Sequence, residues 1–225
     1  MSPTHSRTTV VIGGNRGIGL ALCRHLKSLG RDVIATCRSS SPALDAVGAR
    51  VESGVDVTTD DGVGALGRRL EGVAIDELIC SAGILRQDDL DGVDLDDIRA
   101  QLEVNALGPL RVVKALRRNL GRGGKIALLT SRMGSIADNG SGGYYGYRMS
   151  KAALNAAGMS MARDLRGAGI AVAILHPGYV RTDMTGGNGS VDPDQAARQL
   201  CDRIETLTLE TTGTFWHASG QVLPW

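Results

Sequence analysis

Short apolar, β-branched runs alternate with amphipathic stretches along almost the whole chain, and this alternation restricts the fold more than any other feature. The expected strands are Thr8–Ile12, Asp32–Cys37, Arg50–Val55, Asp76–Ser81, Lys125–Thr130, Ile170–Leu175 and Thr214–His217. Strands that alternate with helices form a parallel sheet with helices on both faces. We therefore expect an α/β protein of three layers around a parallel sheet of these seven strands.

Length and charge limit the possible classes of protein. The chain has 225 residues and a net charge of +1. This length suits one domain, and no repeat or linker divides residues 1–225. The near-zero charge gives no reason to expect nucleic acid as a partner. Since no signal peptide and no apolar run of roughly 18 residues appears, we expect a cytoplasmic protein with no membrane contact.

The cysteines and histidines show no pattern typical of metal sites. Cys23, Cys37, Cys80 and Cys201 lie far apart with no C-x-x-C spacing. Most of them fall in apolar patterns, so we expect core thiols rather than disulfides. The histidines, His5, His25, His176 and His217, form no pair at ligand spacing, and we predict no metal.

A glycine-rich turn, Gly13–Gly19, joins the first expected strand to the clearest helical pattern, which runs from Ile18 to Leu29 and is closed by Gly30. Glycines allow a tight turn and a close backbone approach, and a helix N-terminus attracts phosphate. A plain turn is the alternative, but the strand and helix on either side favour a pyrophosphate site. The turn also indicates a doubly wound Rossmann fold, whose ligand lies at the carboxyl ends of the strands.

The residues after the second strand indicate which dinucleotide binds. A site for NAD places an acid there, whereas this strand ends in Thr36-Cys37-Arg38, and Arg16 lies inside the glycine turn. Two cations without an acid favour a 2′-phosphate, hence NADP(H); the alternative is that Arg38 is a solvated surface residue. Asp56 follows the third strand and either meets the adenine amino group or caps a turn.

Tyr147 and Lys151 are spaced so that they lie one turn apart on the same face of a helix. A cation beside a phenol favours the phenolate, so we expect a lowered pKa for Tyr147 and a tyrosine that exchanges protons near neutral pH. Tyr144 also precedes a cation, Arg148, by four residues, but an arginine does not deprotonate. Tyr147 is therefore the better candidate.

These motifs, in this order, resemble the classical short-chain dehydrogenase/reductase family over essentially the whole chain, and within it the short members related to carbonyl reductases and C-factor. The resemblance rests on the glycine turn, Ser131, Tyr147-Arg-Met-Ser-Lys151, Asn105 in Glu103-Val-Asn-Ala106, and His176-Pro-Gly-Tyr-Val-Arg-Thr182. It implies four catalytic residues: Ser131, Tyr147, Lys151 and Asn105. Ser135 is a rival to Ser131, and a structural amide is the alternative for Asn105.

The resemblance also implies a role for each residue. Tyr147 would exchange the proton, Lys151 would hold the nicotinamide ribose and Ser131 would bond the substrate carbonyl, while Asn105 would hold a relay water. Val180 and Thr182 would fix the carboxamide. The expected cofactor-binding residues are Gly13, Asn15, Arg16, Gly17, Ile18, Gly19, Arg38, Asp56, Val57, Ser81, Ala82, Gly83, Asn105, Tyr147, Lys151, Pro177, Gly178, Val180 and Thr182.

The expected function is that of an NADP(H)-dependent oxidoreductase that interconverts a small carbonyl compound (aldehyde, ketone or quinone) and its alcohol. The alternative is a non-enzymatic NADP-binding sensor or signalling protein on the same fold. The resemblance implies a homodimer or homotetramer, and the small residues Ala152, Ala153, Ala156, Ala157 and Gly158 suit close helix packing.

Two positions depart from the family pattern. Ile12 stands where the family usually has threonine, and Cys80-Ser81 stand where it has two asparagines. In the family these side chains join the strand ends by hydrogen bonds. We therefore expect that local network to be altered here, with the catalytic groups unaffected.

Overall fold

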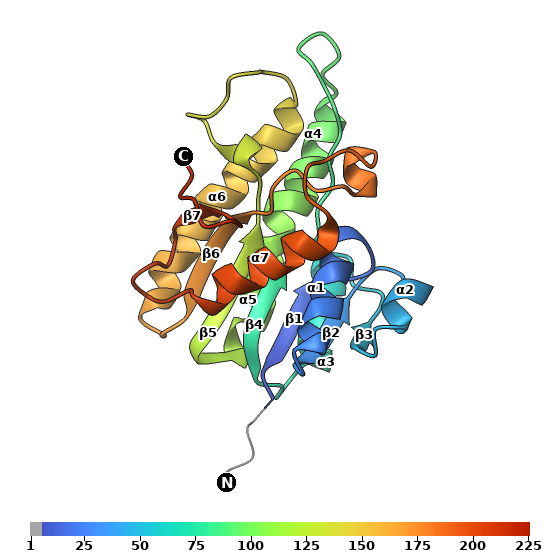
Figure 1. Ribbon diagram of the computed structural model, residues 1–225, viewed down its shortest axis with the longest axis vertical. Coiled ribbons are helices and arrows are strands. Elements are labelled where there is room, and N and C mark those ends of the chain that lie inside the picture. Colours follow the sequence, from blue (N-terminus) through green and yellow to red (C-terminus); the bar gives the residue numbers. More distant parts are fainter. Residues whose placement is uncertain (1–5) are drawn as a thin grey trace.

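The computed structural model describes residues 6–225. Its sheet has seven parallel strands in the order β3-β2-β1-β4-β5-β6-β7 (Figure 1). The strands are β1 (Thr8–Ile12), β2 (Asp32–Thr36), β3 (Arg50–Glu52), β4 (Ile75–Cys80), β5 (Leu120–Leu129), β6 (Ala171–His176) and β7 (Phe215–His217). The order reverses direction between β1 and β4, which is the doubly wound arrangement. The predicted three-layer Rossmann fold is confirmed.

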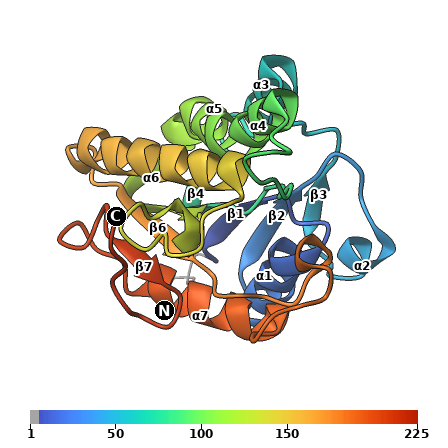
Figure 2. The ribbon, with the colours of Figure 1, turned by 90° about the horizontal axis from the view of Figure 1, so that it is seen from above.

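Helices cover both faces of the sheet (Figure 2). One face carries α3 (Asp60–Arg69), α4 (Leu95–Leu102), α5 (Gly108–Leu116) and α6 (Tyr145–Arg166); the other carries α1 (Gly17–Ser28) and α7 (Pro193–Glu205). The short α2 (Pro42–Asp45) follows β2, and a π-helical turn, η1 (Glu103–Leu107), joins α4 to α5. Short 3-10 turns are also present at η2 (Arg117–Asn119), η3 (Arg132–Gly134) and η4 (Asp183–Thr185).

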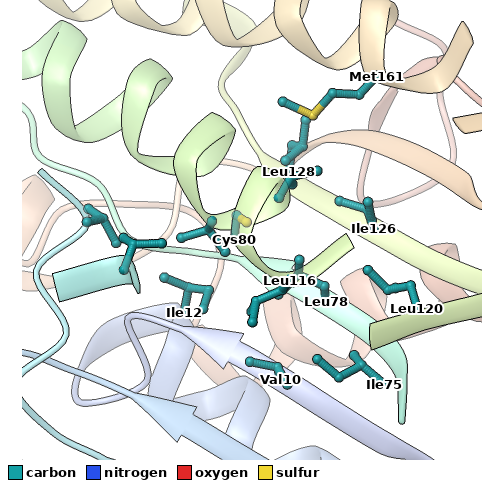
Figure 3. Close-up of a cluster of buried hydrophobic side chains, with 14 of the residues drawn as sticks. Val10, Ile12, Ile75, Leu78, Cys80, Leu116, Leu120, Ile126, Leu128 and Met161 are labelled. Atoms are coloured by element: carbon teal, nitrogen blue, oxygen red, sulfur yellow. The ribbon is translucent and has the colours of Figure 1, made fainter. Parts of the chain in front are cut away.

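The two faces of the sheet bury two large apolar clusters, and successive strand residues alternate between them. Val10, Ile12 and Leu78 pack toward α3, α5 and α6 (Figure 3), whereas Val11 and Ile79 pack toward α1 and α7. The four cysteines lie free and buried within or beside these clusters. Because both faces are apolar, the strands read as near-continuous hydrophobic runs in the sequence.

Two strand boundaries differ from the prediction by more than one residue. β3 ends at Glu52 rather than Val55, because Gly54 adopts a left-handed conformation (φ 73°) that interrupts the extended chain. β5 begins at Leu120, five residues earlier than expected, and its register against β4 shifts between Ile75 and Glu77. Both differences lie away from the ends of β1, β4, β5 and β6 that carry the predicted site.

Within residues 6–225, no helix combines the length and the apolar character that crossing a membrane requires.

Candidate functional site

A cavity of about 470 Å³ lies at the carboxyl ends of the strands, where the doubly wound fold predicts a ligand. It extends from the glycine turn after β1 to the start of α6. The following predicted site residues line it: Gly13, Asn15, Arg16, Gly17, Ile18, Gly19, Arg38, Asp56, Val57, Ser81, Ala82, Gly83, Ser131, Tyr147, Lys151, Pro177, Gly178, Val180 and Thr182. Asn105 alone among the predicted residues does not.

The glycine turn leaves no room for side chains. A Cβ atom on Gly13, whose φ is 84°, would lie 2.8 Å from the backbone of Ala82 on the neighbouring strand. A Cβ atom on Gly19 would lie 2.0 Å from the carbonyl oxygen of Gly13. The turn also bonds to β2, since the amides of Gly13 and Gly14 donate to the carbonyl of Thr36 at 3.0 and 2.9 Å. Glycine is therefore required here by packing as well as by conformation.

The first turn of α1 faces this cavity with its backbone donors free for a ligand. Its N-cap residue, Arg16, makes no side-chain capping bond, and the first turn contains no acidic residue. Gly17, Ile18 and Gly19 at this helix start all line the cavity. An uncapped N-terminus with positive partial charge suits an anionic group such as a pyrophosphate. The residues present therefore fit a dinucleotide cofactor.

Arg38 and Asp56 lie at the outer end of the cavity, beside the glycine turn. Asn15 donates to the carbonyl of Ser39 at 3.3 Å and accepts, through its own carbonyl, from Ser41 at 2.9 Å, which holds the loop after β2 against the turn. Arg38 is exposed. Asp56 caps a local turn, because its Oδ1 accepts from the amide and hydroxyl of Thr58 at 2.9 and 2.7 Å.

Arg16 has one acidic neighbour in the segment after β6. Its guanidinium lies 3.9 Å from the carboxylate of Asp183, with both side chains well exposed (58% and 85%). Such a contact is weak in water and leaves the arginine available to another anion. Thr182 packs close to the glycine turn, since a Cβ atom on Gly17 would lie 3.5 Å from its methyl group. The segment after β6 thus closes over the phosphate end of the cavity.

The catalytic candidates gather at the other end. Ser131 follows β5, and Tyr147 and Lys151 lie one turn apart in the first half of α6. All three are buried, with exposures of 7%, 8% and 4%. The Lys151 ammonium donates to the carbonyl of Leu129 at 2.9 Å and lies 5.7 Å from the centre of the Tyr147 ring. The predicted side chains therefore share one wall of the cavity.

Burial, rather than Lys151, determines the pKa of Tyr147 in this structure. Loss of solvent raises the pKa of Tyr147 to about 12, and only the interaction with the Ser131 hydroxyl lowers it. Burial likewise lowers the pKa of Lys151 to about 8. The expectation that the lysine depresses the tyrosine pKa is therefore corrected, because Lys151 Nζ is directed to the Leu129 carbonyl. Tyr147 is a protonated phenol at neutral pH.

Asn105 has a fully bonded side chain. It lies in the π-helical turn η1 and is fully buried. Its Oδ1 accepts from the Ile84 amide at 2.8 Å, and its Nδ2 donates to the Ile84 carbonyl at 2.8 Å and to the Ser150 hydroxyl at 3.0 Å. These bonds connect η1 to the segment after β4, at Ile84, and to α6, at Ser150. The side chain thus has the bonds expected of a structural amide, and the water-holding role of Asn105 stays a prediction.

The two departures from the family pattern form an apolar junction. Ile12 and Cys80 are register partners at the ends of β1 and β4 (Figure 3), and each is at most 2% exposed. The backbone joins these ends directly, because the Ser81 amide donates to the Ile12 carbonyl at 3.0 Å. Burial raises the pKa of the Cys80 thiol to about 12. Packing and backbone bonds thus hold this junction, and the cavity beside it is intact.

The cavity also includes residues that sequence reasoning did not assign. His176, at the end of β6, packs edge-on against His217 with ring centres 5.1 Å apart. Burial, with repulsion from nearby cations, lowers the pKa of His176 to about 3, so it is neutral. The one sequence feature that could have placed His176 in the cavity is its position directly before Pro177, a predicted cofactor-binding residue. Arg132, Ile84 and Leu85 also line the cavity.

Large side chains near the catalytic candidates divide between the cavity wall and the start of α6. Met133, Tyr179 and Met184 line the cavity, whereas Tyr144 and Tyr145 do not. Tyr144 precedes α6 in a left-handed conformation, and its neighbour Tyr145 begins the helix. Both tyrosines therefore belong to the helix start and not to the cavity wall.

Comparison with known proteins agrees with this geometry. The family model for short chain dehydrogenases matches residues 7–192. The chain belongs to the short-chain dehydrogenase family, as predicted. A Rhodococcus sp. (strain AD45) protein, 1-hydroxy-2-glutathionyl-2-methyl-3-butene dehydrogenase, is 44% identical over 97% of this chain and 99% of its own length. The C-signal protein of Myxococcus xanthus is also 44% identical, over 60% of this chain and 83% of its own.

Solved structures support the same assignment. The carbonyl reductase Sniffer of D. melanogaster superposes with a TM-score of 0.90 at 28% identity, covering 98% of this chain and 100% of that one. An NADPH-bound carbonyl reductase from chicken fatty liver gives a TM-score of 0.87 at 29% identity, covering 98% and 99%. The nicotinamide cofactor in solved relatives, NADP or NADPH, is the one predicted for this chain.

Proposed function

We propose that the protein is an NADP(H)-dependent oxidoreductase that interconverts a small carbonyl compound and its alcohol. The observation that carries this proposal is the position of Ser131, Tyr147 and Lys151 on one wall of the cavity whose other end is the glycine turn. A dinucleotide held at that turn would share the cavity with these three side chains. A nicotinamide bound there supplies or accepts the hydride.

Each side chain has a defined task at the reacting carbonyl. Tyr147, protonated because burial raises its pKa, donates its phenolic proton to the carbonyl oxygen in reduction and takes it back in oxidation. The Ser131 hydroxyl interacts with Tyr147 and bonds the same oxygen, which fixes the orientation of the substrate. Lys151 lies on the same wall and would hold the nicotinamide ribose hydroxyls, which would place the nicotinamide against the substrate.

We propose that NADP(H) is preferred over NAD(H) because the residues beside the glycine turn are cationic. Arg38 is exposed next to the cavity, and Arg16 lies in the turn itself. The end of β2 carries no acid that would repel a 2′-phosphate. Charge-assisted bonds to such a phosphate, at roughly 1.5–3 kcal/mol each, give a preference of about ten- to hundredfold or more.

The test is a pair of binding titrations followed by turnover. NADPH and NADH are titrated side by side by fluorescence or calorimetry, and NADPH consumption is then followed with aldehydes, ketones and quinones. The name of the Rhodococcus relative is a reason to add hydroxyl compounds with a glutathionyl substituent, using NADP as the oxidant. We expect NADPH to bind more tightly and at least one compound to turn over. Binding without turnover would favour the alternative, a non-enzymatic NADP sensor.

We also propose a cytoplasmic homodimer or homotetramer. An exposed stripe on α6 includes Tyr145, Met149 and Ala156, and Leu107 and Leu110 are exposed on η1 and α5. Gly158 does not belong to this exposed stripe, because it packs against Ile174 and Leu128 of the sheet. Light scattering tests the proposal: a dimeric or tetrameric mass is expected, and a monomeric mass would overturn it.

A further inference from the structure

The helix that carries Tyr147 and Lys151 begins in an unusual way. Gly142, Gly143 and Tyr144, which precede α6, have φ values of 65°, 62° and 54°, and Tyr144 is the one non-glycine residue among residues 6–225 with a positive φ. That conformation is unfavourable for a side chain with a Cβ atom. Tyr144, as N-cap, makes no side-chain capping bond. Something outside the helix must therefore fix its start.

Asp88, from the segment after β4, supplies the missing cap. Its carboxylate accepts from the amides of Tyr145 and Gly146, the latter at 3.1 Å, and its carbonyl accepts from the Tyr144 amide at 2.8 Å. Two of the helix donors that have no partner within the helix are thus satisfied by one distant carboxylate. The negative charge also suits the positive end of the helix.

The segment that carries Asp88 is itself held by side chains of α4 and η1. The Ile84 backbone bonds twice to Asn105, at 2.8 Å each, and the Arg86 amide donates to Gln101 at 3.0 Å. Alternate residues, 84, 86 and 88, are therefore each fixed by a separate partner. Since Ile84 and Leu85 line the cavity, the same segment connects the cavity wall to the start of α6.

We propose that Asp88 is a positioning residue, which caps α6 from the neighbouring segment and so sets the place of Tyr147 at the reacting carbonyl. Tyr147 is the third residue of α6 and lies in the turn that Asp88 holds. A small displacement of a proton donor lowers the rate of proton transfer steeply. The glycine turn that holds the nucleotide lies at the other end of the cavity, so nucleotide binding is affected little. This proposal rests on the proposed function.

The test compares Asp88→Ala, Asp88→Asn and Asp91→Ala with the wild type. Asp91 is an exposed carboxylate of the same segment and serves as the matched control. Hydrogen exchange at the amides of Tyr145–Arg148, the NADPH Kd, and kcat and KM for the carbonyl substrate are measured at a temperature where each variant is folded. Asp88→Asn retains one acceptor oxygen in place of two. If Asp88→Ala does not fold, the comparison is made with Asp88→Asn alone.

We expect Asp88→Ala to speed exchange at the start of α6 and to lower kcat by about tenfold, with the NADPH Kd changed less than about twofold. Asp88→Asn should restore part of both losses, and Asp91→Ala should behave as the wild type. Unchanged exchange, or faster exchange with an unchanged kcat, would overturn the proposal.

The two proposals fail in different ways. If the wild type turns over no substrate, the proposed function fails, and the exchange data still decide whether Asp88 holds the helix. If the wild type is active and Asp88→Ala loses kcat and NADPH affinity equally, the carboxylate stabilises the whole cavity and the specific positioning role is wrong.

Discussion

The two ends of the cavity are built in different ways. The catalytic end consists of buried side chains, Ser131, Tyr147 and Lys151, fixed by β5 and the first half of α6. The nucleotide end consists of backbone amides, glycines that exclude a Cβ atom, and exposed arginines. Changes at the first end should therefore alter the rate of the reaction, and changes at the second should alter cofactor affinity.

Tyr147→Phe should have the largest effect. The variant lacks the exchangeable proton but fills the same buried position, so we expect kcat to fall about 100- to 10,000-fold while the NADPH Kd stays close to that of the wild type. Tyr144→Phe is the matched control, because Tyr144 lies outside the cavity. Steady-state kinetics and NADPH titration check both variants. An unchanged kcat would remove Tyr147 from the catalytic role.

Arg38→Ala tests the nucleotide end. Loss of this guanidinium should raise the NADPH Kd by about ten- to hundredfold and leave the NADH Kd and kcat at saturating cofactor unchanged. Arg117→Ala, an exposed arginine away from the cavity, is the control. Titrations of both cofactors measure the effect. An equal loss for NADH and NADPH would show that Arg38 does not read the 2′-phosphate.

The junction beneath the nucleotide end offers a test of stability. Ile12→Thr places a hydroxyl in the apolar contact with Cys80. Ile12→Val is the matched control, because valine has the shape of threonine without the hydroxyl. We expect Ile12→Thr to lower the free energy of unfolding by about 1–3 kcal/mol more than Ile12→Val does. Denaturant unfolding measures the difference. In the double variant with Cys80→Asn, the two polar groups can pair, so the loss should be smaller than the sum of the single losses. Strict additivity would contradict a coupled junction.

An effect of similar size concerns the pH dependence of stability at the catalytic end. Burial lowers the pKa of Lys151 from 10.5 to about 8. Between these values the unfolded chain holds a proton that the folded protein has lost, so rising pH stabilises the folded state. In cofactor-free protein, wild type should gain about 2–3 kcal/mol over Lys151→Met across this range, as measured by urea unfolding. A difference that does not change with pH would contradict the effect of burial.

The two ends also differed in how much the sequence predicted. The Tyr147–Lys151 spacing and the glycine turn identify their elements, since each depends on local geometry. The hydrogen-bond partners of Asn105 and the raised pKa of Tyr147 were not predictable from the sequence, because they depend on a partner far away in sequence, Ile84, and on burial. Asp88 gave no local signal at all, since its partners lie more than fifty residues further along the chain.

The most direct test of the account follows the hydride itself. NADPH deuterated at the transferring position is incubated with the wild type and a carbonyl substrate from the panel, and the product is examined by mass spectrometry. We expect one deuterium on the new alcohol carbon with the wild type and a large loss of labelled product with Tyr147→Phe, although both bind NADPH. Tight NADPH binding without label in any product would contradict an oxidoreductase and favour an NADP-binding sensor.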